Sequence, residues 1–286
     1  HIGPNEHSSF EEYMGYKGKL LQMCKVGLGN ADDAHWEEIK AGHTCDLHTF
    51  AVEGEADFKA ENIHYRAQGE FMGVVYDVIG KYAMTVDVNI PGLFNVYNGL
   101  VALGVCALAG VSEEAIKEAL KTITVNGRME IVYASDRFSV IVDYAHNEVS
   151  MESLLLTLRD YHPKRLVCIF GCGGNRSKLR RYGMGEIGGR LADLTIITAD
   201  NSRFEEVEDI IADIKIGMAK TTGKFVEIPD RREAIHYAIK HAEEGDMIVV
   251  IGKGHEDYQE IKGVRYPFLD RAVALEALKE EGLVSC

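Results

Sequence analysis

The sequence predicts an α/β protein whose second half is a doubly wound, mostly parallel sheet. From about residue 127 onward, short apolar runs alternate with stretches of helical periodicity, which is typical of parallel βαβ units. The chain has 286 residues and is 46% apolar, enough for two ordinary domains with real cores. We therefore expect a domain boundary near Gly127-Arg128, giving domains of residues 1–127 and 128–286.

The first half is expected to begin with an amphipathic helix over residues 9–24. A capping box opens it, with Ser9 as the cap and Glu12 three positions later. Alternating and β-branched residues further along favour strands and hairpins. The remaining expected elements are a helix over about 33–41, strands and hairpins over about 46–90, and helices over about 94–109 and 112–123.

In the second half, five apolar strands run directly into polar or glycine-rich loops. Open α/β sheets bind ligands beyond the carboxyl ends of their parallel strands, where such loops meet. No role can be assigned to the fourth loop, around Asp230 and Arg231. The strands and their loops are 140–142 with 143–147, 166–170 with 171–176, 194–198 with 200–203, 224–228 with 229–232, and 247–251 with 252–256.

Charge and cysteine usage narrow the class of protein. A net charge of −14 argues against a nucleic-acid or anionic-membrane binder, so any substrate phosphate must be met by individually placed groups. The six cysteines contain no C-x-x-C pair, which favours reduced core thiols over a disulfide or zinc framework. With no long apolar run and no signal peptide, a cytoplasmic compartment is expected.

Two strand-end loops carry groups suited to anions. Glycines at 171–174 let backbone amides approach an anion, although glycine in such a turn can also be purely steric. Arg176 and the basic residues after it favour the anionic ligand. In the loop 200–203, Arg203 can grip a carboxylate through two hydrogen bonds. The alternative is that Asp200 or Ser202 caps the next helix while Arg203 pairs with Glu205 or Glu206.

The other polar motifs remain open between ligand binding and local structure. Glu256 can bind an ammonium group, whereas His255 can be only a turn residue. Asp143 and His146 can bind a ribose or a base edge, although an Asp-x-x-His pattern is often structural. Asn95, near the head of a helix, can serve as an N-terminal cap.

Read together, these segments resemble the ATP-dependent Mur ligases, and within that family the members that add meso-diaminopimelate. The resemblance covers nearly the whole chain, and eight short motifs in the family's order are jointly specific. They are Tyr13-x-x-x-Lys17, Asn30-x-Asp32-Asp33, Phe94-Asn95-x-x-Asn98, Gly127-Arg128-Met129-Glu130, Asp143-Tyr144-Ala145-His146, residues 170–176, Asp200-Asn201-Ser202-Arg203 and residues 252–259.

The resemblance implies a Rossmann-like C-terminal domain preceded by the rear part of a P-loop-type ATPase α/β domain. It implies ATP and Mg²⁺ as cofactors. Lys17 would be a carbamylated lysine that helps to hold the magnesium ion, and His7 resembles the family's metal-binding histidine. The nucleotide side of the site would consist of Asn95, Arg128, Asp143 and His146.

The same resemblance implies an amino-acid pocket for meso-diaminopimelate. Its far end carries a carboxylate and an ammonium group, whereas the far end of lysine has no carboxylate for Arg203 to bind. Ser202 replaces the family's proline and is expected to loosen the loop that aims Arg203, and Tyr182 also departs from the family's usual proline. The five matching residues are Arg176, Asn201, Arg203, Gly252 and Glu256.

The implied reaction joins diaminopimelate to UDP-N-acetylmuramoyl-L-alanyl-D-glutamate through an acyl phosphate formed from ATP. The sequence contains no G-x-x-x-x-G-K-[ST] motif. We therefore expect the chain to be part of a longer ligase, monomeric and inactive by itself. A lysine-adding or other amino-acid-adding ligase, and a non-catalytic binding module descended from one, are the alternatives.

Overall fold

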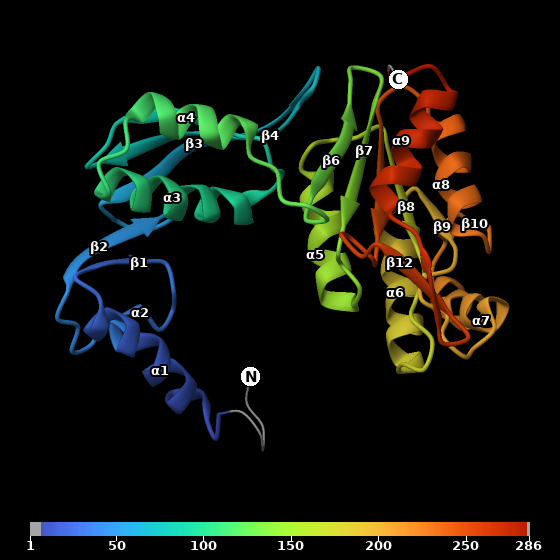
Figure 1. The fold of residues 1–286 in the computed structure, drawn as a ribbon, viewed down its shortest axis with the longest axis horizontal. Helices are drawn as coiled ribbons and strands as arrows, with labels where there is room; N and C mark the ends of the chain where they lie inside the picture. The colour runs from blue at the N-terminus through green and yellow to red at the C-terminus, as the bar shows by residue number, and fades with distance from the viewer. Residues whose placement is uncertain (1–6, 285–286) are drawn as a thin grey trace. The chain divides into compact units, whose positions relative to one another are not determined.

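The structure is a computed structural model that describes residues 7–284, and the chain divides into two compact units. The first unit comprises residues 1–64 and 74–123, and the second comprises residues 65–73 and 124–286. Between residues 7 and 284, no helix is long and apolar enough to cross a membrane. The ribbon in Figure 1 follows the chain through both units.

A five-stranded sheet in the order β1-β2-β3-β4-β5 forms the centre of the first unit. Strands β1, β2 and β3 pair in parallel, and β4 pairs with β5 antiparallel. Alternate residues of these strands are buried, as expected for a sheet with one covered face. The strands are β1 (Val26–Asn30), β2 (Asp46–Ala51), β3 (Phe58–Gln68), β4 (Phe71–Gly80) and β5 (Met84–Val88).

Two helices of the first unit begin at serine residues that cap them. The Ser9 side chain accepts a hydrogen bond from the Glu12 amide, and Ser112 caps a later helix in the same way. The expected helix over 33–41 is only one turn long. The helices are α1 (Phe10–Met23), α2 (Trp36–Ile39), α3 (Leu93–Leu108) and α4 (Glu113–Thr122).

The second unit contains a six-stranded sheet in the order β10-β9-β8-β11-β7-β6. All neighbouring strands pair in parallel except β6, which runs antiparallel to β7 at the edge. The mostly parallel sheet predicted from the sequence is confirmed. Its strands are β6 (Glu130–Ala134), β7 (Phe138–Asp143), β8 (Arg165–Phe170), β9 (Leu194–Ile197), β10 (Phe225–Glu227) and β11 (Asp246–Ile251).

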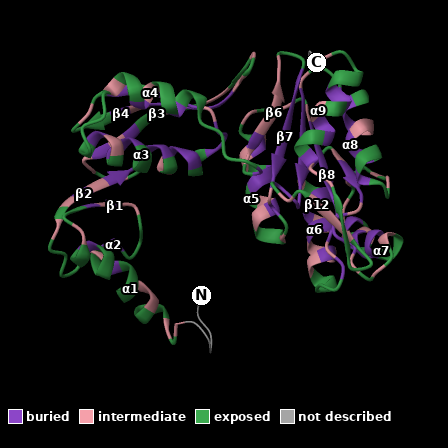
Figure 2. Cartoon of the chain, viewed as in Figure 1, coloured by how far each residue is buried: buried purple, intermediate pink, exposed green. Residues whose placement is uncertain are grey.

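Helices cover both faces of this sheet, so the fold is doubly wound. One core contains residues of α5, α6 and α7, and the other contains residues of α8 and α9. The central strands are buried throughout, as Figure 2 shows in purple. The helices are α5 (Glu148–Arg159), α6 (Lys178–Leu191), α7 (Val207–Met218), α8 (Arg231–Lys240) and α9 (Asp270–Glu280).

Two features of the second unit were not predicted. An antiparallel hairpin, β12 (Tyr258–Ile261) with β13 (Val264–Pro267), follows the last strand-end loop. Residues 65–73 also belong to this unit, because Met72 is buried in its core and the Tyr161 hydroxyl donates to the Gly73 carbonyl at 3.0 Å. Neither the hairpin nor the packing of residues 65–73 leaves a periodic pattern in the sequence.

Candidate active site

A cavity of about 320 Å³ lies in the second unit beyond the carboxyl ends of β7, β8, β9 and β11. Four of the five predicted strand-end loops line it, and the fourth loop, around Arg231, does not. Polar and charged groups predominate along its wall. The lining residues are Tyr144, His146, Gly171, Cys172, Gly173, Arg176, Arg180, Asp200, Asn201, Arg203, Gly252 and Glu256.

The glycine-rich loop after β8 brings a free cation to the cavity. A Cβ atom at Gly174 would lie 1.8 Å from the Ser202 carbonyl oxygen, so only glycine permits this close approach. Arg176 is exposed, and its guanidinium forms no hydrogen bond or ion pair with any described residue. The loop after β8 thus needs glycine for steric reasons, and it also carries an arginine that is available to an anion.

A buried hydrogen-bond network joins the loops after β9 and β11. The Asn201 amide donates to Glu256 Oε2 at 2.9 Å, and the Lys253 ammonium donates to Asn201 Oδ1 and to Glu256 Oε2, each at 3.1 Å. No described residue donates to Glu256 Oε1. Glu256 lines the cavity, so its Oε1 can accept a hydrogen bond from an ammonium group there.

Arg203 is fixed by backbone contacts on two sides. Its Nη1 donates to the Gly174 carbonyl at 2.7 Å, and its Nε lies 3.6 Å from Glu260 Oε2 on the β12–β13 hairpin. Its backbone amide also donates to the Glu260 carbonyl at 2.9 Å, and its φ is 53°. The hairpin that sequence reasoning missed is thus the support for this arginine.

The alternative interpretation of the loop 200–203 is wrong in its details. Arg203 pairs with Glu260, whereas Glu205 pairs with Arg181. The N-cap position of α7 is occupied by Glu206, whose side chain forms no capping hydrogen bond, so neither Asp200 nor Ser202 caps this helix.

The loop around Ser202 is held by backbone hydrogen bonds, and its expected loosening stays a prediction. Ser202 is buried, and its carbonyl accepts a hydrogen bond from the Glu205 amide at 3.0 Å. The neighbouring Asn201 carbonyl accepts from the Gly174 amide at 2.8 Å. Backbone hydrogen bonds therefore hold the chain on both sides of this position.

Gly252 lies where a side chain cannot. Its φ is 113°, and a Cβ atom would lie 2.6 Å from Asp200 Oδ2. Asp200 also accepts from the Asn201 amide at 2.5 Å, and burial raises the pKa of its carboxyl group. Gly252 thus lets the loop after β11 approach the loop after β9.

One end of the cavity is aromatic. The Tyr144 ring lies 4.8 Å from the His146 ring and 5.6 Å from the His255 ring, and the Arg128 guanidinium lies 4.7 Å from the Tyr144 centroid. His146 lines the cavity directly. Asp143 is instead committed to local structure, since its carboxylate accepts from two backbone amides at 2.7 and 2.8 Å.

Asn95, Lys17 and His7 lie in the first unit. Asn95 is not a cap residue: it is the third residue of α3 and donates to the Pro91 carbonyl at 2.7 Å. Lys17 lies 5.3 Å from the Tyr13 ring, and His7 contacts the same ring at 5.2 Å. No group of three or more histidine, cysteine or acidic side chains suited to a metal occurs among residues 7–284.

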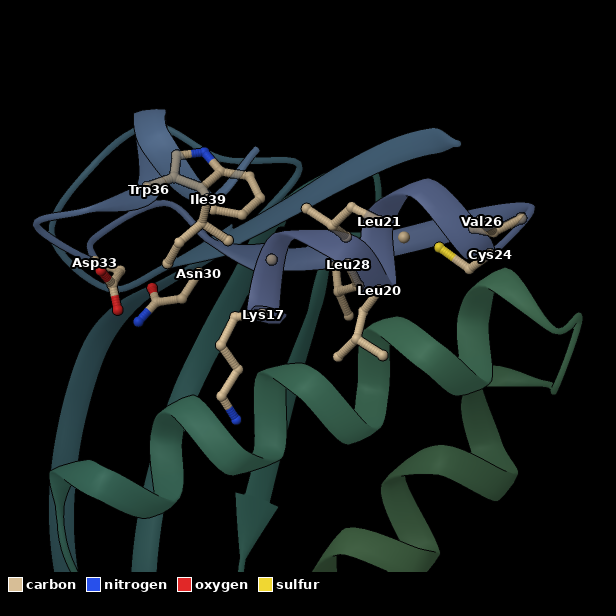
Figure 3. Close-up of a pocket in the computed structure, with 12 residues that line it drawn as sticks. Lys17, Leu20, Leu21, Cys24, Val26, Leu28, Asn30, Asp33, Trp36 and Ile39 are labelled. Carbon is tan, nitrogen blue, oxygen red and sulfur yellow. The ribbon is translucent and has the colours of Figure 1, made fainter. Parts of the chain in front are cut away.

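Lys17 also lines a second cavity of about 390 Å³ between α1, β1 and α2. In Figure 3, Asn30 and Asp33 lie toward one end of this cavity, while Leu20, Leu21 and Cys24 lie toward the other. The predicted roles of Lys17 and His7 in metal binding and of Asn95 in nucleotide binding remain predictions.

Sequence reasoning missed several residues of the site. Tyr144 and Lys253 lie inside motifs that the sequence analysis used. Neither residue type in itself distinguishes a site residue from a structural one, so the sequence did not mark them. Arg180 lines the cavity from the first turn of α6, which follows the loop that carries Arg176. The sequence places it among the basic residues that favour an anionic ligand, but does not single it out as a site residue.

The fold and the cavity can now be compared with known proteins. The protein-family model for the Mur ligase middle domain matches residues 1–106, and the model described as "Mur ligase, glutamate ligase domain" matches residues 127–254. These two matches cover most of the chain, and the chain belongs to the Mur ligase family.

Several proteins similar to this chain are named UDP-N-acetylmuramoyl-L-alanyl-D-glutamate–2,6-diaminopimelate ligase. The protein of that name from Clostridium botulinum is 39% identical over 278 residues, covering 96% of this chain and 56% of its own. The one from Alkaliphilus oremlandii is 40% identical over 285 residues, covering 97% and 58%. A solved structure of that name has a TM-score of 0.75 at 32% identity, covering 99% and 59%. This chain therefore spans little more than half the length of these relatives.

Proposed function

We propose that this chain is the amino-acid-recognising portion, with part of the ATPase domain, of a ligase that adds meso-diaminopimelate to UDP-N-acetylmuramoyl-L-alanyl-D-glutamate. The names of the similar proteins support this reaction. The observation that carries it is the charge pattern of the 320 Å³ cavity, in which Arg176 and Arg203 stand with Glu256. Free thiols at all five described cysteines are compatible with a cytoplasmic location.

The cavity offers a complement for each charge at the far end of diaminopimelate. Arg203 and Arg176 provide guanidinium donors for the carboxylate, and Glu256 Oε1 provides an acceptor for the ammonium group. The Gly252 backbone lines the wall between them. Lysine would satisfy Glu256 but leave the arginines without a carboxylate, which favours diaminopimelate as the acceptor.

For the nucleotide we propose the aromatic end of the cavity. His146 and Tyr144 line it, and Arg128 stacks on Tyr144 with its guanidinium exposed, so these groups are available to a phosphate or a base. Asp143 would act by holding the backbone of Met129 and Ala145 in place. Separately, we propose Asn95 of the first unit as a nucleotide-binding residue.

For Mg²⁺ we propose Lys17 and His7. A carbamylated Lys17 would supply the carboxylate-type oxygens that Mg²⁺ prefers, and His7 contacts the same tyrosine ring as Lys17. Mg²⁺ keeps several waters and binds substrate phosphates, so few protein ligands are needed. When bound, the ion would neutralise phosphate charge.

In the proposed reaction the D-glutamate carboxylate takes the γ-phosphoryl group of ATP, and the amine of diaminopimelate then displaces phosphate to form the amide. The residues of this chain would contribute by position and charge rather than by covalent chemistry. Arg176, Arg203 and Glu256 would hold the far end of diaminopimelate, which leaves its other amino group to react.

Calorimetric titration of the 286-residue chain tests the proposal, because the cavity lies entirely in the second unit. We expect meso-diaminopimelate to bind and L-lysine to bind at least about tenfold more weakly, since each lost charge contact costs on the order of 1.4 kcal/mol or more. Equal affinity for the two amino acids, or no binding of diaminopimelate, would refute the specificity assigned here.

Arg203→Ala should weaken diaminopimelate binding by about 2 to 5 kcal/mol if the bound ligand covers this charge. Lysine binding should change little. Arg265→Ala is the matched control, because Arg265 is an exposed arginine on the β12–β13 hairpin that supports Arg203, and it stacks on Tyr258 outside the cavity. An unchanged diaminopimelate affinity in Arg203→Ala would remove Arg203 from the pocket.

A further inference from the structure

The loop of residues 229–232, which has no assigned role, leads into one partner of a fully buried ion pair, Arg231 with Asp270. Arg231 is the first residue of α8, and Asp270 is the first residue of α9. The Arg231 Nε and Nη2 atoms donate to Asp270 Oδ1 and Oδ2 at 2.7 Å each, and neither side chain is exposed to solvent. A bidentate pair of this kind fixes the plane of the guanidinium.

The remaining donors of Arg231 reach the two strand ends that carry the proposed amino-acid pocket. Its Nη1 donates to the Ala199 carbonyl at 3.2 Å, and its Nη2 donates to the Ile251 carbonyl at 2.9 Å. Ala199 directly precedes the loop that contains Asn201 and Arg203. Ile251 directly precedes the Gly252 loop that contains Glu256.

These two strand ends have no other direct connection through the sheet. Strand β8 lies between β9 and β11 and pairs with both, so no backbone ladder joins β9 to β11. Arg231 spans this gap beneath the cavity. Its guanidinium therefore links the base of the loop that carries the cation Arg203 to the base of the loop that carries the anion Glu256, below the Asn201–Lys253–Glu256 network that joins the same loops at the cavity.

We propose that Arg231, oriented by Asp270, is a positioning residue for the amino-acid pocket, which rests on the function proposed above. It touches no ligand and acts through the two carbonyl groups. A ligand with a carboxylate and an ammonium group at one end is held well only if its two partners keep a fixed separation. A buried ion pair often stabilises a fold no better than apolar residues of the same volume, so stability alone is a weak reason for this pair.

A matched control lies at the amino ends of the central strands, opposite the carboxyl ends that face the cavity. Arg165 and Asp246, the first residues of β8 and β11, also form a bidentate pair, with distances of 3.0 and 2.6 Å. Asp246 is buried, as Asp270 is. Asp246→Asn thus breaks a comparable pair in the same sheet, far along the strands from the cavity.

The experiment compares Arg231→Lys, Asp270→Asn, Asp270→Glu and Asp246→Asn in the 286-residue chain. Hydrogen–deuterium exchange of residues 199–204 and 251–257 is the first readout, and it needs no ligand. The dissociation constant for meso-diaminopimelate is the second. The thermal midpoint is recorded for each variant so that local loosening is separated from general destabilisation.

We expect exchange in both loops to accelerate in Arg231→Lys and Asp270→Asn, and the dissociation constant for diaminopimelate to rise roughly tenfold. Asp270→Glu, which keeps the carboxylate, should restore part of both. Asp246→Asn should lower the thermal midpoint without changing either readout. Asp270→Asn retains the arginine and its two carbonyl bonds, so it provides the test if Arg231→Lys does not fold.

Unchanged exchange in both loops of the folded variants would overturn the positioning role. So would equal acceleration in Asp246→Asn, because the effect would then be general. If the loops loosen but diaminopimelate binds as tightly as before, Arg231 has no role in recognition and the proposal fails. If the unsubstituted chain binds no diaminopimelate, the proposed function fails, whereas the exchange measurement still decides whether Arg231 holds the loops.

Discussion

At the scale of single residues, some charged atoms that line the cavity are already hydrogen-bonded within the protein, and others are available to a ligand. Glu256 illustrates this division, because Oε2 accepts from Asn201 and Lys253 while Oε1 receives no hydrogen bond from a described residue. The Asn201 side-chain amide donates to Glu256 through Nδ2 and accepts from Lys253 through Oδ1. Its contribution to recognition is therefore to aim Glu256 rather than to bind a ligand.

Glu256→Gln tests whether this carboxylate binds the far ammonium group. Glutamine can still accept from Asn201 and Lys253, but its amide cannot form an ion pair with an ammonium group. We expect diaminopimelate binding to weaken by about 2 kcal/mol, roughly 30-fold. Binding of 2-aminopimelate, which has the far carboxylate but no far amino group, should be the same in both proteins, as measured by calorimetry.

Asp257→Asn is the control, because Asp257 is the adjacent acidic residue, is exposed and does not line the cavity. It should leave both affinities unchanged. A loss of 2-aminopimelate binding in Glu256→Gln equal to the loss for diaminopimelate would show that the substitution disturbs the whole pocket, and the assigned role of Glu256 would be wrong.

At the scale of elements, the helix that follows the glycine-rich loop is held by a buried arginine. Arg181 of α6 donates to both oxygens of Glu205 at 2.8 Å and to Asp213 of α7 at 2.9 Å. The hydrogen bonds from Arg181 lower the pKa of Glu205 from 4.5 to about 2. Glu205 also accepts from the Asn175 amide, so the same contact anchors the loop that carries Arg176.

This contact predicts an acid-dependent stability. Because the folded pKa of Glu205 lies below its ordinary value, its stabilisation is complete above about pH 4.5 and is lost as the pH falls toward 2. Glu205→Gln should cost roughly 1.5 to 3 kcal/mol in the free energy of unfolding at pH 7. The difference from the unsubstituted chain should shrink steadily between pH 4.5 and 2 in urea titrations.

Glu208→Gln, at an exposed position in the first turn of α7, is the matched control. It should have a small effect that does not follow this pH range. A Glu205→Gln difference that stays constant down to pH 2 would contradict the assigned ion pair.

At the scale of the whole molecule, the sequence predicts what is periodic or capped and misses what depends on contacts between distant segments. The five parallel strands of the second unit and the helix starts at Ser9 and Ser112 were predictable, because burial and capping leave a pattern along the chain. The loops that meet in the cavity were predictable from the strand-end rule. The burial of Arg231 was not, because its ion-pair partner Asp270 lies 39 residues and more than one element away.

The same limit explains the missed hairpin and the short α2. The β12–β13 hairpin is only four residues a side and exposed along β13, so it shows little alternation. Residues 33–41 have helical composition, but the Trp36 ring packs on Gly29 of β1, and only one turn forms. Tertiary packing overrides local propensity at both places.

The two units have separate cores, which predicts separate responses to a ligand. Trp36, the single tryptophan of the chain, is buried in the first unit, and Cys168 is fully buried in the second. Tryptophan fluorescence and thiol labelling of Cys168 therefore report the two units independently. Diaminopimelate at 100 times its dissociation constant should stabilise the second unit by about 2.7 kcal/mol. This should raise the thermal midpoint for Cys168 labelling by roughly 5 to 10 °C and leave that for Trp36 unchanged. A shift confined to Trp36 would place the pocket in the wrong unit, and equal shifts would show that the units unfold together.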